Sequence, residues 1–294
     1  MPITSNVSLK MDFSSLPVSK ATGKPVIHFA HANGMPSRVY QPIFEVLEQH
    51  FTVEYIPTLG FDEQGNPTYP IDNHWKSLTN QIIDSVQALV KKHKVPVIGL
   101  GHSLGALCTL QAIYRKPKLF VQAVLMDPPL IYGKNNLLWH AAKLVSQERA
   151  DKMSPAGISK NRRDVWDSRE QAHELLRPKS FFKNFDERTF EGYLQHGLRD
   201  QEDGTVTLTI PKEAEVAVFR TNPSLYWLKP NKPPKRSVTL LIGDSSRFYE
   251  MGFPNKVRRR LSIPFKLHAG GHMFPLEYPD SVAQLILATI AEQA

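Results

Sequence analysis

The sequence is poor in cysteine and lacks long apolar runs. Cys108 is the one cysteine among 294 residues, which excludes an internal disulfide and a zinc site built of cysteines. No apolar run reaches the length of about 18 residues that a membrane helix needs. The first 20 residues also lack the charged, apolar and small-residue segments of a signal peptide. We therefore expect a cytoplasmic protein without stable membrane insertion.

Several common ligand-binding signatures are missing as well. The sequence contains no HExxH metal motif, no Walker phosphate loop and no G-x-G-x-x-G after a strand-like run, so no cofactor and no metal is expected. The formal net charge is +8, and a basic surface attracts phosphates. The Lys and Arg residues are nevertheless spread along the chain, and the densest run, KVRRR at 256–260, has the composition of a surface helix. We therefore expect no nucleic-acid partner.

What is present is an alternation of strand-like and helix-like segments, with enough hydrophobic residues (41%) for a large core. Apolar runs typical of buried strands occupy 25–31, 51–59, 95–101, 120–127, 237–244 and 264–270. Helical apolar spacing occupies 38–50, 74–93, 104–114 and the chain from about 280 onward. This alternation predicts parallel strands joined by helices that cover both faces of the sheet. Residues 7–13 alternate in polarity and predict an additional antiparallel edge strand.

The alternation stops between residues 128 and 235. This segment contains helical pieces rich in Arg, Lys and aromatic residues, with one strand-like run at 203–210. We therefore predict an α/β core formed by residues 1–127 and 236–294, interrupted by a mainly helical cap at 128–235.

A candidate nucleophile lies between the strand-like run ending at 101 and the next helix. Gly101-His102-Ser103-Leu104-Gly105 is a G-x-S-x-G motif in the strand-turn-helix context that this motif requires. The glycines permit a tight turn that exposes the Ser103 hydroxyl at the head of the helix. There the N–H of Leu104 can donate a hydrogen bond to an oxyanion.

A serine needs a general base, and His272 is the candidate. It follows the last strand-like run and two glycines and precedes the final helix. His102 and His31 are interpreted as structural. A second oxyanion donor is expected in FAHANGMPS, residues 29–37, where small residues free the backbone. Asn33 is favoured, and Gly34 or Met35 would serve in another register.

These segments resemble the α/β-hydrolase superfamily. The resemblance rests on GHSLGA, HANG and GGHMFPLEYP, which occur in the order expected for that superfamily over nearly the whole chain. Within it, FAHANGMP, RRDVWDSREQA and YLQHGLRDQEDGTVTL are similar to capped hydrolases that include peroxisomal lipase-like fungal members. The resemblance implies the α/β-hydrolase fold and a serine hydrolase of the lipase or esterase type. It does not identify the substrate, because this scaffold hosts many chemistries.

The family motif does not assign the acid of the predicted triad, because the position where the resemblance expects it, three residues after Gly243, is Ser246. Asp244 lies two residues before that position, and Asp127 ends the preceding strand-like run. The similar haloalkane dehalogenases draw their acid from that preceding strand. We therefore favour Asp127 and keep Asp244 as the alternative.

A serine, a histidine and an aspartate with two backbone donors predict acyl transfer. The simplest substrate is a small-molecule carboxylic ester of small or medium size and apolar character. Hydrolysis of carbon–carbon, thioester or amide bonds, cofactor-free haloperoxidase activity and a non-catalytic ligand-binding role stay open, as do the monomer and the homodimer. Cap residues that either line the pocket or pack the cap are Trp139, Trp166, Phe181, Phe182, Tyr193, Tyr226 and Trp227. Arg162 and Arg163 are candidates to meet an acidic group of the substrate.

Overall fold

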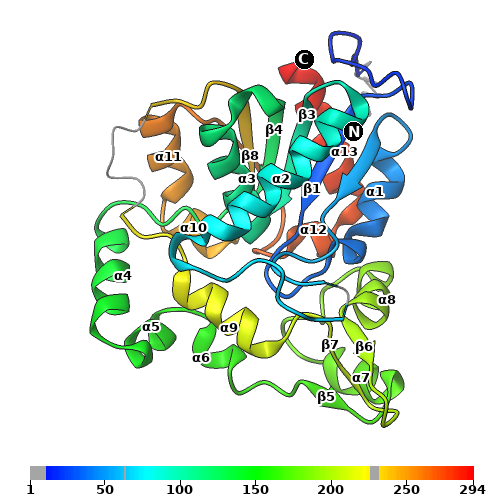
Figure 1. The fold of residues 1–294 in the computed structure, drawn as a ribbon. Helices are drawn as coiled ribbons and strands as arrows, with labels where there is room; N and C mark the ends of the chain where they lie inside the picture. Colours follow the sequence, from blue (N-terminus) through cyan, green and yellow to red (C-terminus); the bar gives the residue numbers. More distant parts are fainter. Residues whose placement is uncertain (1–10, 63, 226–231) are drawn as a thin grey trace, which may run out of the picture.

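A parallel β-sheet forms the centre of the molecule (Figure 1). The computed structural model describes residues 11–62, 64–225 and 232–294. Six strands pair in the order β2-β1-β3-β4-β8-β9, and all of these pairings are parallel. The strands are β1 (Val26–Ala30), β2 (Thr52–Tyr55), β3 (Val97–His102), β4 (Phe120–Met126), β8 (Ser237–Gly243) and β9 (Phe265–His268).

Helices cover both faces of this sheet, as predicted, and the α/β-hydrolase fold class is confirmed. One face packs against α1 (Gln41–Leu47) and α13 (Pro279–Gln293). The other packs against α2 (Lys76–His93), α3 (Leu104–Arg115) and α11 (Phe253–Leu261). Successive strand side chains point to opposite faces, so Ile27 and Phe29 join the first core and Val26 and Ala30 the second.

Short helical turns complete the core. They are η1 (Ser37–Tyr40), η2 (Asn73–Trp75), η3 (Pro117–Leu119), α10 (Arg247–Glu250) and α12 (Phe274–Glu277). The strand order reverses at β1, because β2 lies on one side of it and β3 on the other. In open α/β sheets, ligands bind at such a reversal, beyond the carboxyl ends of the strands. The loops after β1 and β3 are therefore neighbours at the place where a site is expected.

An insertion between β4 and β8 lies at the carboxyl end of the central sheet (Figure 1). Its helices are α4 (Lys134–Val145), α5 (Gln147–Met153), α6 (Ala156–Ser159), α7 (Arg169–Leu176), α8 (Glu187–His196) and α9 (Lys212–Thr221). The run at 203–210 contains β7 (Val206–Leu208), which pairs antiparallel with β5 (Val165–Trp166) and β6 (Leu198–Asp200). The two short strands β5 and β6 were not predicted.

The predicted edge strand at 7–13 is not found in its described part. Residues 7–10 lie outside the described residues, and residues 11–13 form no strand. Phe13 instead packs edge-on against Phe51, with ring centroids 4.9 Å apart, and contacts His50. Its apolar side chain is thus partly buried against the core without strand pairing. None of the helices in the described ranges is long and apolar enough to cross a membrane.

Candidate active site

Ser103 lies on the sharp turn between β3 and α3. Its φ of +51° is in the left-handed region that side chains rarely adopt. The flanking glycines explain why the turn is possible. A Cβ at Gly105 would lie 2.1 Å from the carbonyl oxygen of Ala30, and a Cβ at Gly101 would lie 2.8 Å from the amide nitrogen of Ala106. The close packing of backbone around the turn therefore excludes any larger residue at either position.

The structure brings His272 and Asp127 to this serine. Nε2 of His272 lies 2.9 Å from Oγ of Ser103, and Nδ1 lies 2.6 Å from Oδ2 of Asp127. Asp127 is fully buried, whereas the His272 side chain is 34% exposed. A carboxylate only accepts hydrogen bonds, so Nδ1 carries the proton and the Nε2 lone pair faces the serine hydroxyl. This arrangement can remove a proton from Ser103.

Asp127 follows β4 with a φ of +40°. Its amide donates to the carbonyl of Leu241 in β8, over 2.8 Å, which fixes the turn against the neighbouring strand. The hydroxyl of Ser246 donates to the same Oδ2 that receives His272, at 2.5 Å. Ser246 occupies the position where the resemblance expects the acid, and sequence reasoning did not foresee that it would donate to Asp127.

Asp244, the alternative acid, is not brought to His272. It is exposed, and its Oδ1 accepts a hydrogen bond from the amide of Gly270 at 3.1 Å. This contact holds the turn after β8 against the loop that follows β9. The distances therefore associate His272 with Asp127 and give Asp244 a role in the loop.

The loop after β1 contacts the serine turn directly. The amide of Gly105 donates to the carbonyl of His31 at 3.0 Å. The N–H groups of Asn33 and Leu104 donate none of the hydrogen bonds found among the described residues, whereas that of Met35 donates to Ala32 at 3.0 Å. Asn33, in the loop after β1, and Leu104, next to Ser103 in the chain, thus keep backbone donors that are free for a ligand, as does Gly34, whereas the Met35 donor is already engaged.

Two side chains, those of His31 and Asn33, hold this loop in place. His31 is buried, with Nδ1 2.7 Å from the carbonyl of Ala32 and Nε2 2.6 Å from the amide of Leu59. Burial lowers the pKa of His31 to about 4, so the ring is neutral and supports the loop. The side-chain amide of Asn33 donates to the carbonyl of Glu215 in α9 at 3.0 Å. The insertion therefore anchors the loop that carries the Asn33 amide.

A buried pair, Tyr40 and His102, connects that loop to the backbone of His272. Nε2 of His102 lies 2.9 Å from the carbonyl oxygen of His272, and Nδ1 lies 2.7 Å from the Tyr40 hydroxyl. Burial lowers the pKa of His102 well below its ordinary value, so its ring is neutral. Because the carbonyl accepts, Nε2 carries the proton and Tyr40 donates to Nδ1. Tyr40 in turn accepts from the amide of Ala32 at 3.3 Å. No motif or pattern in the sequence pointed to Tyr40.

Most of the candidate substrate-recognition residues of the insertion pack within it. Arg162 pairs with Glu215 at 2.9 Å, and Arg163 donates to the carbonyl of Val165 at 2.6 Å. The indole of Trp139 donates to the carbonyl of Asn222 at 3.0 Å. Trp166, Phe182 and Tyr193 are buried, and Phe181 is exposed. Tyr226 and Trp227 lie outside the described residues.

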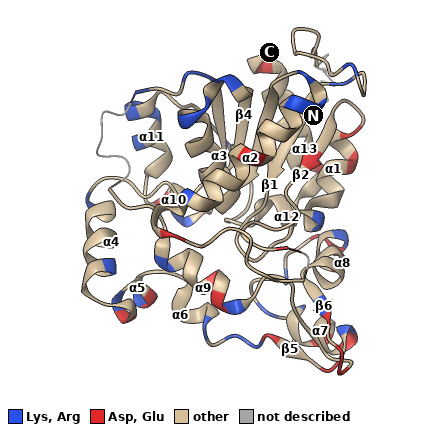
Figure 2. Ribbon diagram, viewed as in Figure 1, with Lys and Arg blue, Asp and Glu red and all other residues tan. Residues whose placement is uncertain are grey.

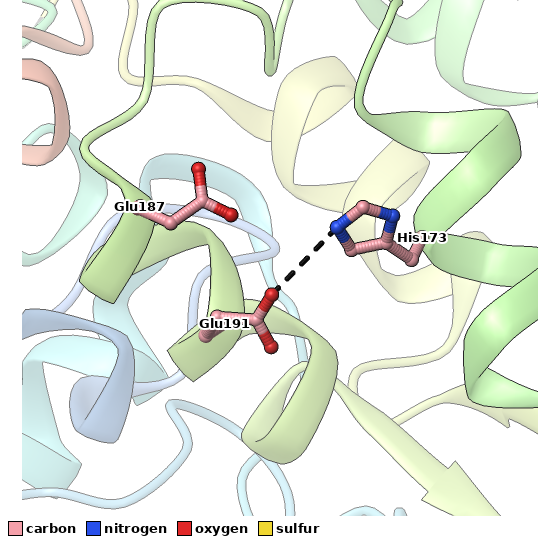
Figure 3. Close-up of side chains that lie close together, drawn as sticks. All are labelled: His173, Glu187 and Glu191. Carbon is pink, nitrogen blue, oxygen red and sulfur yellow. Dashed lines mark ion pairs between the residues drawn. The ribbon is translucent and has the colours of Figure 1, made fainter.

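One group of side chains in the insertion has the residue types of a metal site. His173 on α7 and Glu187 and Glu191 on α8 offer ligand atoms within 4.8 Å of one another (Figure 3). Nε2 of His173 is 3.7 Å from Oε1 of Glu191. The glutamates are exposed, and Arg177 pairs with Glu187 at 2.8 Å. A cation would have to displace Arg177, so these residues do not form a ready metal site.

Together, the parallel sheet, the strained serine turn and the adjoining histidine and aspartate define the architecture of an α/β-hydrolase. Residues 29–285 match the family model described as the alpha/beta hydrolase family. The chain therefore belongs to that family.

Comparison with known proteins gives more distant similarities. The type I acyl-CoA thioesterase mpaH of Penicillium brevicompactum is 25% identical over 223 residues, which cover 65% of this chain and 49% of the relative. The chain thus spans about half the length of the curated relatives it matches.

Among solved structures, E-2-(acetamidomethylene)succinate hydrolase has a TM-score of 0.69 at 18% identity and covers 90% of both chains. The peroxisomal α/β-hydrolase Lpx1 of Saccharomyces cerevisiae has a TM-score of 0.68 at 16% identity, covering 92% of this chain and 77% of that chain. At these identities the two structures establish a shared fold.

Proposed function

We propose that this protein is a serine hydrolase that cleaves the ester bond of a small or medium apolar acyl substrate. The observation that carries this proposal is the continuous series of contacts from Ser103 through His272 to Asp127, at 2.9 Å and 2.6 Å. Both distances lie within the reach required for proton transfer between a nucleophile and its base.

In the proposed reaction, His272 takes the hydroxyl proton as Oγ of Ser103 attacks the carbonyl carbon. Asp127 holds the histidine tautomer and stabilises the imidazolium that forms. The imidazolium then gives its proton to the leaving alcohol, which releases an acyl-enzyme. A water molecule, deprotonated by the same ring, hydrolyses the acyl-enzyme and regenerates Ser103.

The negative charge of each tetrahedral intermediate needs donors that are already oriented. We assign this role to the backbone N–H of Leu104, which follows Ser103, and to that of Asn33, in the loop whose His31 carbonyl accepts from Gly105; neither N–H donates to another described group. Such a donor contributes about 3 kcal/mol to catalysis in comparable sites. The Asn33 side chain, held by Glu215 at 3.0 Å, keeps its own loop oriented.

We further propose that residues 128–235 act as a cap that selects the substrate. The segment lies beyond the carboxyl ends of the strands, where Ser103 also lies (Figure 1). The Asn33–Glu215 contact links it to the predicted oxyanion loop. A change in the cap is therefore expected to alter which acyl groups reach Ser103.

A thioester is the second candidate substrate. It is favoured by the three curated relatives, each of which is named a type I acyl-CoA thioesterase. The same three side chains would perform the reaction. Because a thiolate is a better leaving group than an alkoxide, it would depend less on proton donation by His272.

Paired substrates test both proposals. The p-nitrophenyl ester and the coenzyme A thioester of each acyl group, from acetyl to palmitoyl, are compared by kcat/KM. Ser103→Ala is expected to lower turnover of the preferred substrate by about 10⁴-fold or more, whereas Ser180→Ala, at an exposed serine, serves as the matched control. Turnover that survives Ser103→Ala would remove Ser103 from the mechanism, and a preference for thioesters at every chain length would replace the ester with the thioester.

A further inference from the structure

The end of the sheet opposite Ser103 carries a concentration of positive charge that the linear sequence conceals. All six central strands are parallel, so they begin at one end, and Ser103 and Asp127 follow strands at the other end. Short segments rich in Lys and Arg precede five of the strands. These segments are 20–24, 91–96, 115–119, 232–236 and 258–264, and none of them contains Asp or Glu.

We call the cations of these segments the basic end. They are Lys20, Lys24, Lys91, Lys92, Lys94, Arg115, Lys116, Lys118, Lys232, Lys235, Arg236, Arg258, Arg259 and Arg260. All are exposed except Lys24 and Arg236, which are partly exposed. Figure 2 shows blue segments on α11 and on the adjoining connections at this end of the sheet.

The basic end accounts for more than the whole net charge. The chain has 36 Lys and Arg against 28 Asp and Glu, and without these 14 cations it would have 22 against 28, a net charge of −6 instead of +8. The molecule is therefore polarised along the strand direction. The Debye length is about 8 Å at physiological ionic strength, so such a field acts mainly within that distance of the surface.

Few of these cations are neutralised within the protein. Among the described residues, Lys92 is the one member of the basic end that pairs with a carboxylate, Glu54, at 2.6 Å. Other contacts of the group are with neutral acceptors. Arg115 donates to the side-chain oxygen of Asn80 at 2.7 Å, and Arg236 donates to the carbonyl of Pro117 at 2.9 Å. The second contact joins two neighbouring basic segments, 232–236 and 115–119.

The shape and composition of the basic end favour one class of anionic partner. The cations lie on the connections of five adjacent strands, which at about 4.8 Å per strand gives a face roughly 20 Å across. The five segments contain no Phe, Tyr or Trp, so they offer none of the stacking surfaces on which single-stranded nucleic acids bind. An acidic protein that delivers the substrate would have to bind near Ser103, which lies at the opposite end of the sheet from the basic end. A membrane surface of anionic headgroups is also broad, and binding to it requires neither aromatic stacking nor a position near Ser103.

We propose that the basic end docks this protein onto anionic lipid membranes by electrostatic adsorption, with the Ser103 end turned away from the bilayer. Lysine and arginine near an anionic surface attract it without insertion of apolar residues. The absence of a membrane-crossing helix among the described residues is compatible with this form of binding.

Vesicle sedimentation tests the proposal directly. The full chain is mixed with vesicles of phosphatidylcholine alone or of phosphatidylcholine and phosphatidylserine. Binding is expected with the second composition and is expected to fall as salt is raised. In the variant with Arg258→Gln, Arg259→Gln and Arg260→Gln, binding is expected to weaken by roughly 100-fold, since each cation contributes roughly fivefold.

Two further variants keep the result interpretable. Lys116→Gln with Lys118→Gln and Lys235→Gln removes the same charge from other segments and is expected to weaken binding similarly. Lys152→Gln with Lys179→Gln and Lys183→Gln, all exposed cations of the insertion, makes the same change in net charge and is expected to retain binding. The melting temperature of each variant reports its folding, and its ester hydrolysis reports the proposed active site.

The outcomes that overturn the proposal are distinct. Equal binding to both vesicle compositions would show that headgroup charge is not recognised. Equal losses in the basic-end and insertion variants would show that net charge alone matters. Binding to duplex DNA without binding to phosphatidylserine vesicles would assign the surface to nucleic acid.

Discussion

Exchanging the two candidate acids provides a sharp test of the orienting role of Asp127. Asp127→Asn removes the carboxylate that lies 2.6 Å from Nδ1 of His272 and permits the wrong histidine tautomer. Loss of this orienting group is expected to lower kcat by about 10⁴-fold, which corresponds to about 5.5 kcal/mol in the activation barrier. Asp244→Asn keeps a side-chain oxygen that can accept from the Gly270 amide and removes an exposed negative charge, so it is expected to cost less than about tenfold.

The position of Ser246 allows the acid to be relocated. Its hydroxyl and Nδ1 of His272 both contact Oδ2 of Asp127, at 2.5 Å and 2.6 Å. The two distances place the Ser246 hydroxyl at most 5.1 Å (2.5 + 2.6) from Nδ1 of His272, so we expect the longer side chain of an aspartate at 246 to reach that nitrogen. The double variant Asp127→Asn with Ser246→Asp is expected to have at least tenfold higher activity than Asp127→Asn alone. Ser246→Asp alone would bring two carboxylates together and raise the pKa of one of them, so it is expected to lower activity near neutral pH.

These variants are assayed by steady-state hydrolysis of the best p-nitrophenyl ester, with melting temperature as the folding control. Full activity in Asp127→Asn, with a loss of several orders of magnitude in Asp244→Asn, would refute the assignment. If the double variant folds but has no more activity than Asp127→Asn, the inference that a carboxylate at 246 or at 127 can contact Nδ1 of His272 is refuted.

Three other predictions concern the support of the site and of the insertion. Tyr40→Phe leaves Nδ1 of buried His102 without its donor and is expected to lower kcat roughly 10-fold to 100-fold with little change in KM. Tyr55→Phe is the control. Equal effects of the two substitutions would contradict a specific link from Tyr40 through His102 to the backbone of His272. Gly105→Ala places a Cβ 2.1 Å from the Ala30 oxygen and is expected to lower the free energy of unfolding by more than about 3 kcal/mol. The control is Gly192→Ala, which is expected to be tolerated because the nearest atom to its new Cβ lies 3.6 Å away. Equal melting temperatures of the two variants would disprove the packing argument. Hydrogen bonds from Arg220 lower the pKa of Asp151 from 3.8 to about 2, so Asp151 adds about 2 kcal/mol of stability above pH 4. That stability is lost as pH falls through the folded-state pKa, and denaturant unfolding of Asp151→Asn is expected to show a deficit at pH 7 that has largely, but not completely, disappeared at pH 2.

The sheet and its flanking helices were predictable because each has a strong apolar pattern. The runs at 25–31, 95–101 and 237–244 coincide to within two residues with β1, β3 and β8, which are almost wholly buried. The short strands β5 and β6 were not predictable, because two or three residues give no periodic signal. The alternation at 7–13 failed in its described part because Met11 and Phe13 pack on the core without strand partners.

The site was predictable where a motif fixes both the residue type and its place in the fold. Ser103 and His272 have such motifs, and the structure brings them within 2.9 Å. The contribution of Ser246 was not predictable, because its hydrogen bond to Asp127 depends on the packing of β4 against β8. Tyr40 was missed for the same reason, since 62 residues of sequence separate it from His102. The basic end was hidden because its segments are far apart in sequence and adjacent in the sheet.

Covalent labelling of Ser103 tests the central claim most directly. The protein is treated with a fluorophosphonate and digested, and the modified peptide is identified by mass spectrometry in wild type and in His272→Ala. We predict rapid labelling of wild type at Ser103 and labelling slowed by about 10³-fold or more in the variant. Labelling at another residue, or equal rates in the two proteins, would contradict the account.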